Sequence, residues 1–261
     1  MAIWARACLA VVLAVAACSS PKPVRPGDAE TGYRTMNAMG TLDTVHLRGL
    51  VELHWSDDEG THQDQGDLEV WMRGNDHVSA RVTKFGDVYF WSGSTPEGSF
   101  TFDLASEPTT LTTAETATGA AAALPTAALR RLLGIAGLPA EAVSISGPNV
   151  VHVELDRADG SHEVLDLDAA GRLVKHITIT TADGDVVTAE HRDHDRGIRL
   201  GGHTLARYVD VRFDGTLMRL MLAEGSSPTE LPKAVFDLER LRLALRPDRV
   251  EFLKDTGPSG N

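Results

Sequence analysis

The chain has 261 residues, of which 25 are Lys or Arg and 37 are Asp or Glu, so its formal net charge at pH 7 is −12. This balance argues against a nucleic-acid-binding protein, because nothing offsets repulsion by phosphates. Hydrophobic residues make up 42% and charged residues 24%, which is typical of a folded globular protein. Both cysteines, Cys8 and Cys18, lie in the first eighteen residues, which excludes a disulfide, a cysteine metal site and a cysteine nucleophile in the body of the chain.

The first seventeen residues have the pattern of a secretory leader. Arg6 precedes an apolar run that ends at Ala17, and this run is too short to span a bilayer comfortably. Residues 15–18, Val-Ala-Ala-Cys, resemble the bacterial lipobox. The resemblance implies that residues 1–17 are a lipoprotein signal peptide and that Cys18 carries fatty acyl chains, such as palmitate, as a membrane anchor. An ordinary signal peptide or a buried N-terminal helix is the alternative.

A proline-rich segment separates this leader from the body of the chain. Residues 18–28 contain the candidate lipidated cysteine and three prolines in six positions, which favours an extended tether. The last six residues, 256–261, have the composition of a disordered tail, and we expect one domain over residues 29–255. Ser19, directly after the cysteine, resembles the pattern of lipoproteins destined for the outer membrane. We therefore expect a lipid-anchored protein of the cell envelope, facing the periplasm or the exterior, with the outer membrane favoured.

The first half of the body predicts one helix followed by strands. A helical pattern runs from Asp28 to about Leu42, after which the apolar period changes to two. Apolar and polar residues then alternate in five runs, at 45–53, 68–72, 78–82, 88–91 and 100–104. Short turns join these runs, which predicts antiparallel pairing, because parallel strands need long crossover connections.

A central helix is predicted to interrupt the strands. It begins near Pro125, since proline is favoured in a first turn, and it places four apolar residues on one face, namely Leu129, Leu132, Leu133 and Ala136. Three Asp-Gly turns then predict hairpins that pair 151–155 with 164–167, 173–181 with 186–190, and 208–213 with 217–223. Leucines that alternate with arginines over 240–246 predict a further strand.

These elements predict a mainly β (α+β) protein. We expect a single antiparallel meander of about 10–12 strands, curved into an open half barrel, with an N-terminal helix and a central helical lid. The curvature follows from size, because a flat sheet with so many strands would leave its inner face in water.

Three phrases resemble the LolA/LolB-like lipoprotein-carrier superfamily. They are Leu-Asp-Leu-Asp-Ala-Ala-Gly-Arg-Leu-Val at 165–174, Gly-Gly-His-Thr-Leu-Ala at 201–206, and Glu-Leu-Pro-Lys-Ala-Val-Phe-Asp-Leu at 230–238. Together with the order of the predicted elements, the resemblance covers about residues 29–240. It implies a half barrel in which helices cover an apolar cavity for acyl chains, and therefore a carrier of lipid or of the lipid of a lipoprotein.

The chain shows no enzyme signature. The cluster Glu190–Asp195 contains two imidazoles, but strand alternation would place His191 and His194 on opposite faces, so we interpret it as a solvated hairpin end. There is no Gly-x-Ser-x-Gly motif and no phosphate-binding loop. A hydrolase built on an unrecognised triad is the less favoured alternative, because triads are defined by geometry. We expect a non-enzymatic protein with no metal and no cofactor.

The candidate ligand-binding residues are apolar and combine the predicted lid with strand positions. They are Leu129, Leu132, Leu133, Met36, Met72, Phe90, Trp91, Met218 and Leu220. A plain hydrophobic core would use the same residues, so both interpretations stay open. The predicted function is carriage or insertion of lipid or lipoproteins, and the alternative is an envelope sensor or protein-binding module without transfer. The expected partners are a membrane through Cys18, an acyl chain and other envelope proteins, but no nucleic acid.

Overall fold

The computed structural model describes residues 42–58, 60–115, 126–136, 143–146, 150–168 and 173–253. The predicted N-terminal helix, Met36 and Cys18 lie outside the described residues. The strands are β1 (Thr44–Asp57), β2 (Gly60–Arg73), β3 (His77–Lys84), β4 (Asp87–Thr95), β5 (Gly98–Asp103), β6 (Thr110–Ala114), β7 (Val143–Ser146), β8 (Val151–Asp156), β9 (His162–Leu167), β10 (Val174–Thr180), β11 (Val186–Arg192), β12 (Ile198–Leu200), β13 (His203–Leu205), β14 (Tyr208–Phe213), β15 (Thr216–Ser226) and β16 (Arg249–Leu253). The helices are α3 (Thr126–Leu132), η1 (His194–Arg196), η2 (Lys233–Phe236) and α4 (Leu238–Leu245).

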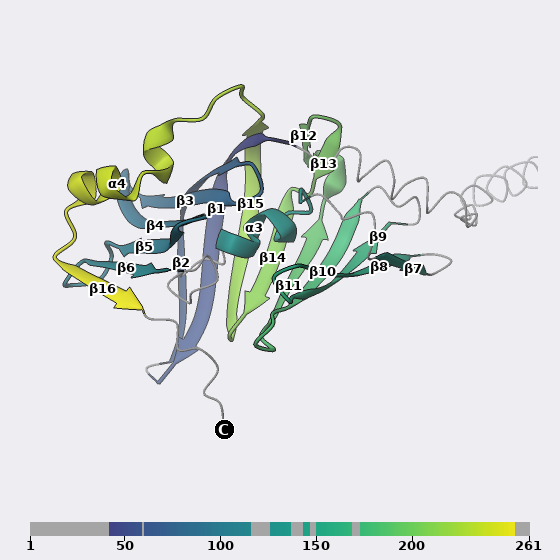
Figure 1. Ribbon diagram of the computed structural model, residues 1–261, viewed down its shortest axis with the longest axis horizontal. Helices are drawn as coiled ribbons and strands as arrows, with labels where there is room; N and C mark the ends of the chain where they lie inside the picture. Colours follow the sequence, from purple (N-terminus) through teal and green to yellow (C-terminus); the bar gives the residue numbers. More distant parts are fainter. Residues whose placement is uncertain are drawn as a thin grey trace, which may run out of the picture.

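Fourteen strands form one open sheet in the order β16-β6-β5-β4-β3-β2-β1-β15-β14-β11-β10-β9-β8-β7 (Figure 1). One wing is the meander from β2 to β6, and the other runs from β7 to β11 and on to β14. The strands β1 and β15 pair with each other and join the two wings. All pairs in the large sheet are antiparallel except that of β16 with β6, which is parallel. The sheet stays open, since β16 and β7 form its two ends.

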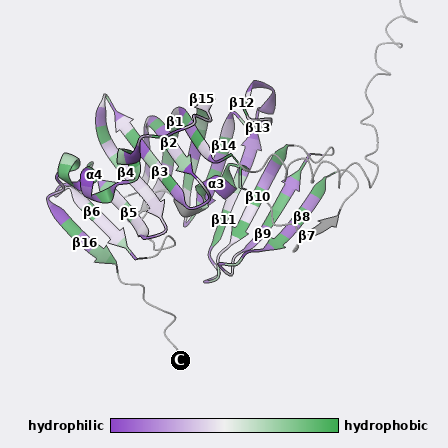
Figure 2. Ribbon diagram, turned by 45° about the horizontal axis from the view of Figure 1, so that its top comes forward, coloured by the Kyte–Doolittle hydropathy of each residue, from purple (hydrophilic) through white to green (hydrophobic). Residues whose placement is uncertain are grey.

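The sheet is bent, and α3 lies between its two wings (Figure 2). We call the face that contacts α3 the inner face and the opposite face the outer face. Because successive side chains of a strand point to opposite faces, every strand contributes to both. The inner face carries the larger hydrophobic core, with buried residues from β1 to β3, from β8 to β11, and from β14 and β15.

A second core covers the outer face of one wing. There Trp71, Trp91 and Phe102 pack beneath η2 and α4, with Val235 and Leu241 from those helices. The two tryptophan rings stack with centroids 5.9 Å apart. The indole Nε1 of Trp91 donates to Ser79 Oγ, which in turn donates to the Val235 carbonyl, so the polar atoms of these two buried side chains are satisfied.

The predicted open, mainly β architecture is confirmed for the described residues, including the three hairpins and the central helix. In the third hairpin, Asp214 and Gly215 have φ values of 43° and 70°, the conformation that a tight two-residue turn requires. The sheet is larger than expected, with fourteen strands among the described residues in place of 10–12. The prediction of a strand over 240–246 was wrong, because the segment forms α4. Asp237 caps this helix by accepting from the Arg240 N–H at 3.0 Å.

The junction between β1 and β15 requires a residue without a side chain at Gly49. A Cβ atom there would lie 2.1 Å from the Met221 carbonyl oxygen. The pairing register also shifts between Arg48 and Gly49, so the two strands approach each other closely at this bulge. Because the contact is with backbone, no side-chain rotation relieves it.

We therefore expect Gly49→Ala to destabilise the protein by about 3 kcal/mol, the upper end of the usual cost of overpacking. Urea unfolding followed by circular dichroism measures the change in the free energy of unfolding. Gln65→Ala, at an exposed position of β2, is the control and should change it by less than about 0.5 kcal/mol. Equal stability of the two variants would contradict the close approach.

Candidate functional site

The inner face and the helix that covers it form the main candidate site. Leu129, Leu132 and Leu133 are 0–3% exposed and belong to the inner core. The helix α3 contacts β3 and β4 of one wing. On the other wing, its Arg131 reaches Glu163 of β9, and its Leu132 carbonyl meets His191 of β11. It therefore bridges the two wings and fills the space between them.

Most predicted site residues meet on this face. Met72, Met218 and Leu220 are buried in the same core as the leucines of α3, and Phe90 packs against it half-buried. Trp91 does not join them, because it pairs with Arg81 and Phe102 in the register of the outer face. The structure thus separates Trp91 from the other described candidates, and their role in ligand binding stays a prediction.

Two arginines attach α3 to the sheet. Arg130 is 3% exposed, and its Nη2 donates to the carbonyl of Leu42, while its Nε and Nη1 find no hydrogen-bond partner in the described part of the chain. Burial lowers the pKa of this guanidinium. Arg131 Nη1 donates to Ser161 Oγ at 2.7 Å and to Glu163 Oε1 at 2.9 Å. The buried Glu163 also accepts from Arg157 Nη2 at 2.8 Å, so it is doubly paired.

A buried histidine contacts the last residue of α3. His191 of β11 is 5% exposed, and its Nε2 lies 2.9 Å from the Leu132 carbonyl oxygen. Since a carbonyl only accepts, Nε2 carries the proton and donates. The ring of His194 stacks on that of His191, with centroids 6.3 Å apart. Our interpretation of this cluster as a solvated hairpin end was wrong, because η1 turns His194 back toward the core.

The described residues offer little to other chemistries. Within them, no group of three or more histidine or carboxylate side chains is arranged to hold a metal ion. In the same part of the chain, none of the helices combines the length and the apolar character needed to cross a membrane.

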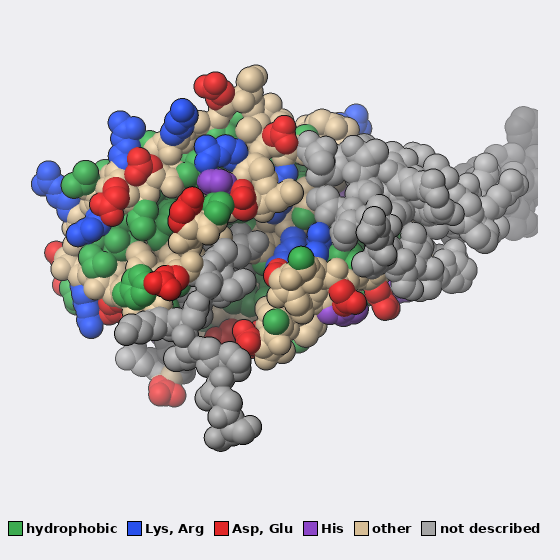
Figure 3. All heavy atoms as spheres, viewed as in Figure 1, with side chains coloured by type: hydrophobic (Ala, Val, Ile, Leu, Met, Phe, Trp, Pro, Cys, Tyr) green, Lys and Arg blue, Asp and Glu red, His purple; other side chains and the backbone are tan. Residues whose placement is uncertain are grey.

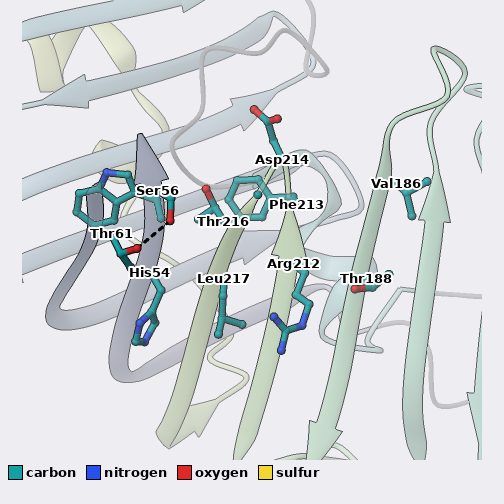
Figure 4. A pocket seen from close by; sticks show the side chains of 12 residues that line it. His54, Ser56, Thr61, Val186, Thr188, Arg212, Phe213, Asp214, Thr216 and Leu217 are labelled. Carbon is teal, nitrogen blue, oxygen red and sulfur yellow. Dashed lines mark hydrogen bonds between the residues drawn. The ribbon is translucent and has the colours of Figure 1, made fainter. Parts of the chain in front are cut away.

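A separate cleft of about 440 Å³ is lined by residues of β1, β2, β11, β14 and β15, in the middle of the strand order. Four residues paired across neighbouring strands line it in a row, namely His54, Leu217, Arg212 and Thr188. Figure 4 shows Arg212 and Leu217 side by side on adjacent strands, with His54 and Thr188 beyond them. The cleft mixes one guanidinium, one carboxylate and one imidazole with hydroxyl groups and apolar side chains, and no residue of α3 lines it.

Three solved structures are similar to this one in fold. A LolA superfamily protein from Nitrosomonas europaea is 11% identical, covers 81% of this chain and 98% of its own, and has a TM-score of 0.53. An outer membrane lipoprotein-sorting protein domain from Vibrio parahaemolyticus is 12% identical, with coverages of 82% and 99% and a TM-score of 0.51. A DUF1329 family protein from Desulfovibrio piger is 11% identical, with the same coverages and TM-score. The chain has a LolA-like fold. Neither a protein-family model nor a curated protein matches the sequence.

Sequence reasoning missed the polar attachments of the LolA-like sheet to α3. Arg130 and Arg131 are adjacent in an otherwise apolar helix, and that pair of cations was the available signal. Their partners Leu42 and Glu163 are distant along the chain, and no local pattern indicates them. His191 was singled out only as part of a solvated cluster, because no local pattern shows that this strand position faces the Leu132 carbonyl.

The buried histidine makes a pH-dependence testable. Burial lowers the pKa of His191 to about 3, while the unfolded chain has a pKa near 6.5. Between these values the unfolded state binds a proton that the native state does not, so stability falls as the pH falls from about 6.5 toward 3. From pH 7 to pH 5, His191 lowers the free energy of unfolding by about 2 kcal/mol.

We expect His191→Gln to reduce this slope, because glutamine offers an N–H to the Leu132 carbonyl without titrating. Urea unfolding at pH 7 and pH 5 gives the measurement. His162→Gln, at the exposed start of β9, controls for the loss of an imidazole. If the two variants have the same slope, His191 does not titrate as described.

Proposed function

We propose that this protein is a non-enzymatic lipid carrier of the bacterial cell envelope. It holds an acyl chain, or the lipid of a lipoprotein, against the inner face of the LolA-like sheet, beneath α3. One of the structures similar in fold is named as an outer membrane lipoprotein-sorting protein domain, which supports this class of cargo.

The observation that carries the proposal is the nature of the cover over the inner face. A helix of seven residues, α3, inserts its leucines between two wings lined by apolar side chains. The inner face is therefore covered by a short helix and not by a second sheet. If it moves aside, an apolar slot opens, with Met72, Met218 and Leu220 in its floor.

The energies favour exchange of α3 for an acyl chain. Burial of each leucine contributes about 1.5–3 kcal/mol, so Leu129, Leu132 and Leu133 together hold α3 down by roughly 6 kcal/mol. An acyl chain with about fourteen methylenes gains about 0.8 kcal/mol for each one that leaves water, or about 11 kcal/mol. The free energy gained by burying the acyl chain therefore exceeds the cost of displacing α3.

Anchoring at Cys18 completes the proposal. Two or more acyl chains on one cysteine give stable membrane attachment, and the proline-rich segment 18–28 gives the domain reach from the surface. The protein then works as a lipid-anchored component of the envelope, most simply at the outer membrane, where it meets other envelope proteins. A sensor on the same fold would bind lipid without passing it on, and transfer to acceptor vesicles separates the two.

Native mass spectrometry of the full chain with Cys18→Ser tests lipid binding. We expect a bound mass that matches a fatty acid, a phospholipid or an acylated peptide. Leu132→Glu should weaken binding of the fluorescent fatty acid cis-parinaric acid at least tenfold, because it places a carboxylate in the slot. Leu243→Glu, on the exposed side of α4, is the matched control and should bind as the parent does. A chain that stays free of lipid after incubation with it would sink the proposal.

Lipidation is tested separately by labelling with palmitate in a bacterial host. We expect incorporation into the parent and into Cys8→Ser, and none into Cys18→Ser, since only the cysteine of the lipobox-like segment becomes the first residue of the mature chain. Label retained in Cys18→Ser would overturn the anchor and leave the lipid-binding proposal standing.

A further inference from the structure

Exposed apolar side chains gather at one end of the sheet, on the outer face and its edge. Of the eight large hydrophobic residues that the described chain exposes, four lie on α4 and β16, namely Leu243, Val250, Phe252 and Leu253. Phe252 is 56% exposed and Val250 52%. Figure 3 shows hydrophobic side chains gathered at the left of the molecule, where Figure 1 places α4, β5, β6 and β16. Clusters of this kind mark interaction sites in soluble proteins.

Two of these residues, Val250 and Phe252, line a groove of about 520 Å³ between the helices η2 and α4 and the strands β5, β6 and β16. We call it the outer groove. Its apolar lining comes from Phe100, Leu111, Phe236, Leu238, Val250 and Phe252. It lies on the face opposite to α3, so its occupant is distinct from the cargo of the inner face.

Within the described residues, the edge strand β16 pairs on one side only, so the backbone hydrogen-bonding groups of its other side are free of any strand. The N–H of Arg249 donates to the Thr109 carbonyl, and Thr113 Oγ1 donates to the Glu251 carbonyl, so the backbone of these two residues faces β6. Backbone groups alternate along a strand, and those of Val250 and Phe252 therefore point away from β6. Asp248 holds the start of the strand in place. Its Oδ2 accepts hydrogen bonds from the N–H of Thr109 at 3.1 Å and from the Thr109 hydroxyl at 2.8 Å.

The rim of the outer groove is acidic. Its charged residues are Glu97, Glu115, Asp237 and Glu239, against the single cation Arg242. Such a rim attracts cations and repels anionic lipid headgroups. A second copy of this chain would bring the same acidic rim and a further net charge of −12. The charge pattern thus favours a partner whose apolar residues are flanked by lysine or arginine.

We propose that the outer groove binds an extended, basic segment of a partner protein, which adds a strand to β16. The backbone of this segment pairs with Val250 and Phe252, and its alternate apolar side chains fill the groove. Flanking basic residues meet Glu97 and Glu115. The site gives a lipid carrier a docking surface that stays available while the inner face holds its cargo.

The probe is a fluorescent peptide of five alternating Val and Thr residues with two Lys at each end, added to the full chain with Cys18→Ser. We expect saturable binding by fluorescence anisotropy. The same peptide with Glu in place of Lys should bind at least tenfold more weakly. Amide hydrogen exchange should slow at Val250 and Phe252 when the Lys peptide binds, and stay unchanged at Glu251, which already faces β6.

Two variants test the groove itself. Phe252→Ser removes an exposed apolar contact, and Glu97→Lys with Glu115→Lys reverses the rim, so each should weaken peptide binding at least tenfold. Asp58→Lys with Asp183→Lys makes the same change of net charge at exposed turns elsewhere and should leave binding within twofold. Binding of cis-parinaric acid should be unchanged in all of them, which separates this proposal from that for the inner face.

Three results would overturn the proposal. Absence of saturable binding by the Lys peptide removes the proposed occupant. A concentration-dependent dimer in sedimentation velocity that Phe252→Ser abolishes assigns the outer groove to a second copy of the chain. Flotation with phosphatidylglycerol vesicles that Phe252→Ser abolishes assigns it to a membrane surface.

Discussion

The pairing of β1 with β15 is the interaction on which the rest of the structure depends. It is the pairing that joins the two wings into one sheet, and its register runs from His46 opposite Ser226 to His54 opposite Leu217. On the outer face, Arg219 of β15 bonds both Glu52 of β1 and Asp210 of β14, so charge pairs reinforce the same junction. Since the strands lie far apart along the chain, their pairing carries a large loop-closure entropy, and folding that requires it is slow.

Once the wings are joined, the bend of the sheet places its two faces in different surroundings. The inner face lies between the wings, where a short helix fills the gap and contacts both. The outer face of the β2–β6 wing faces away from that gap, and its tryptophans and phenylalanines are covered by η2 and α4. Each face therefore has its own core and its own cover. A ligand under α3 and a partner along β16 use surfaces separated by the thickness of the sheet.

Local sequence patterns predicted the hairpins and α3 correctly. Alternation of apolar residues and the Asp-Gly turns were enough for the hairpins, and the spacing of Leu129, Leu132 and Leu133 was enough for α3. The prediction of a strand over 240–246 failed because the leucines there also satisfy a helical period. In α4, Leu238, Leu241 and Leu245 face the outer core, while Leu243 is exposed. Trp91 failed as an inner-face candidate because both faces of β4 are apolar, and only the register with β3 and β5 decides which one each residue faces.

The polar attachments of α3 bear on how the proposed lid is released. Arg131, Glu163 and His191 orient the helix in the closed state, but buried ion pairs contribute little net stability, because the charges regain hydration when they separate. Opening therefore costs less free energy than the number of hydrogen bonds suggests, and most of that cost is the exposure of the leucines. An acyl chain that takes the place of these leucines covers the same apolar residues of the inner face. The arginines and the histidine then specify where α3 returns, and the leucines set how strongly it competes with the cargo.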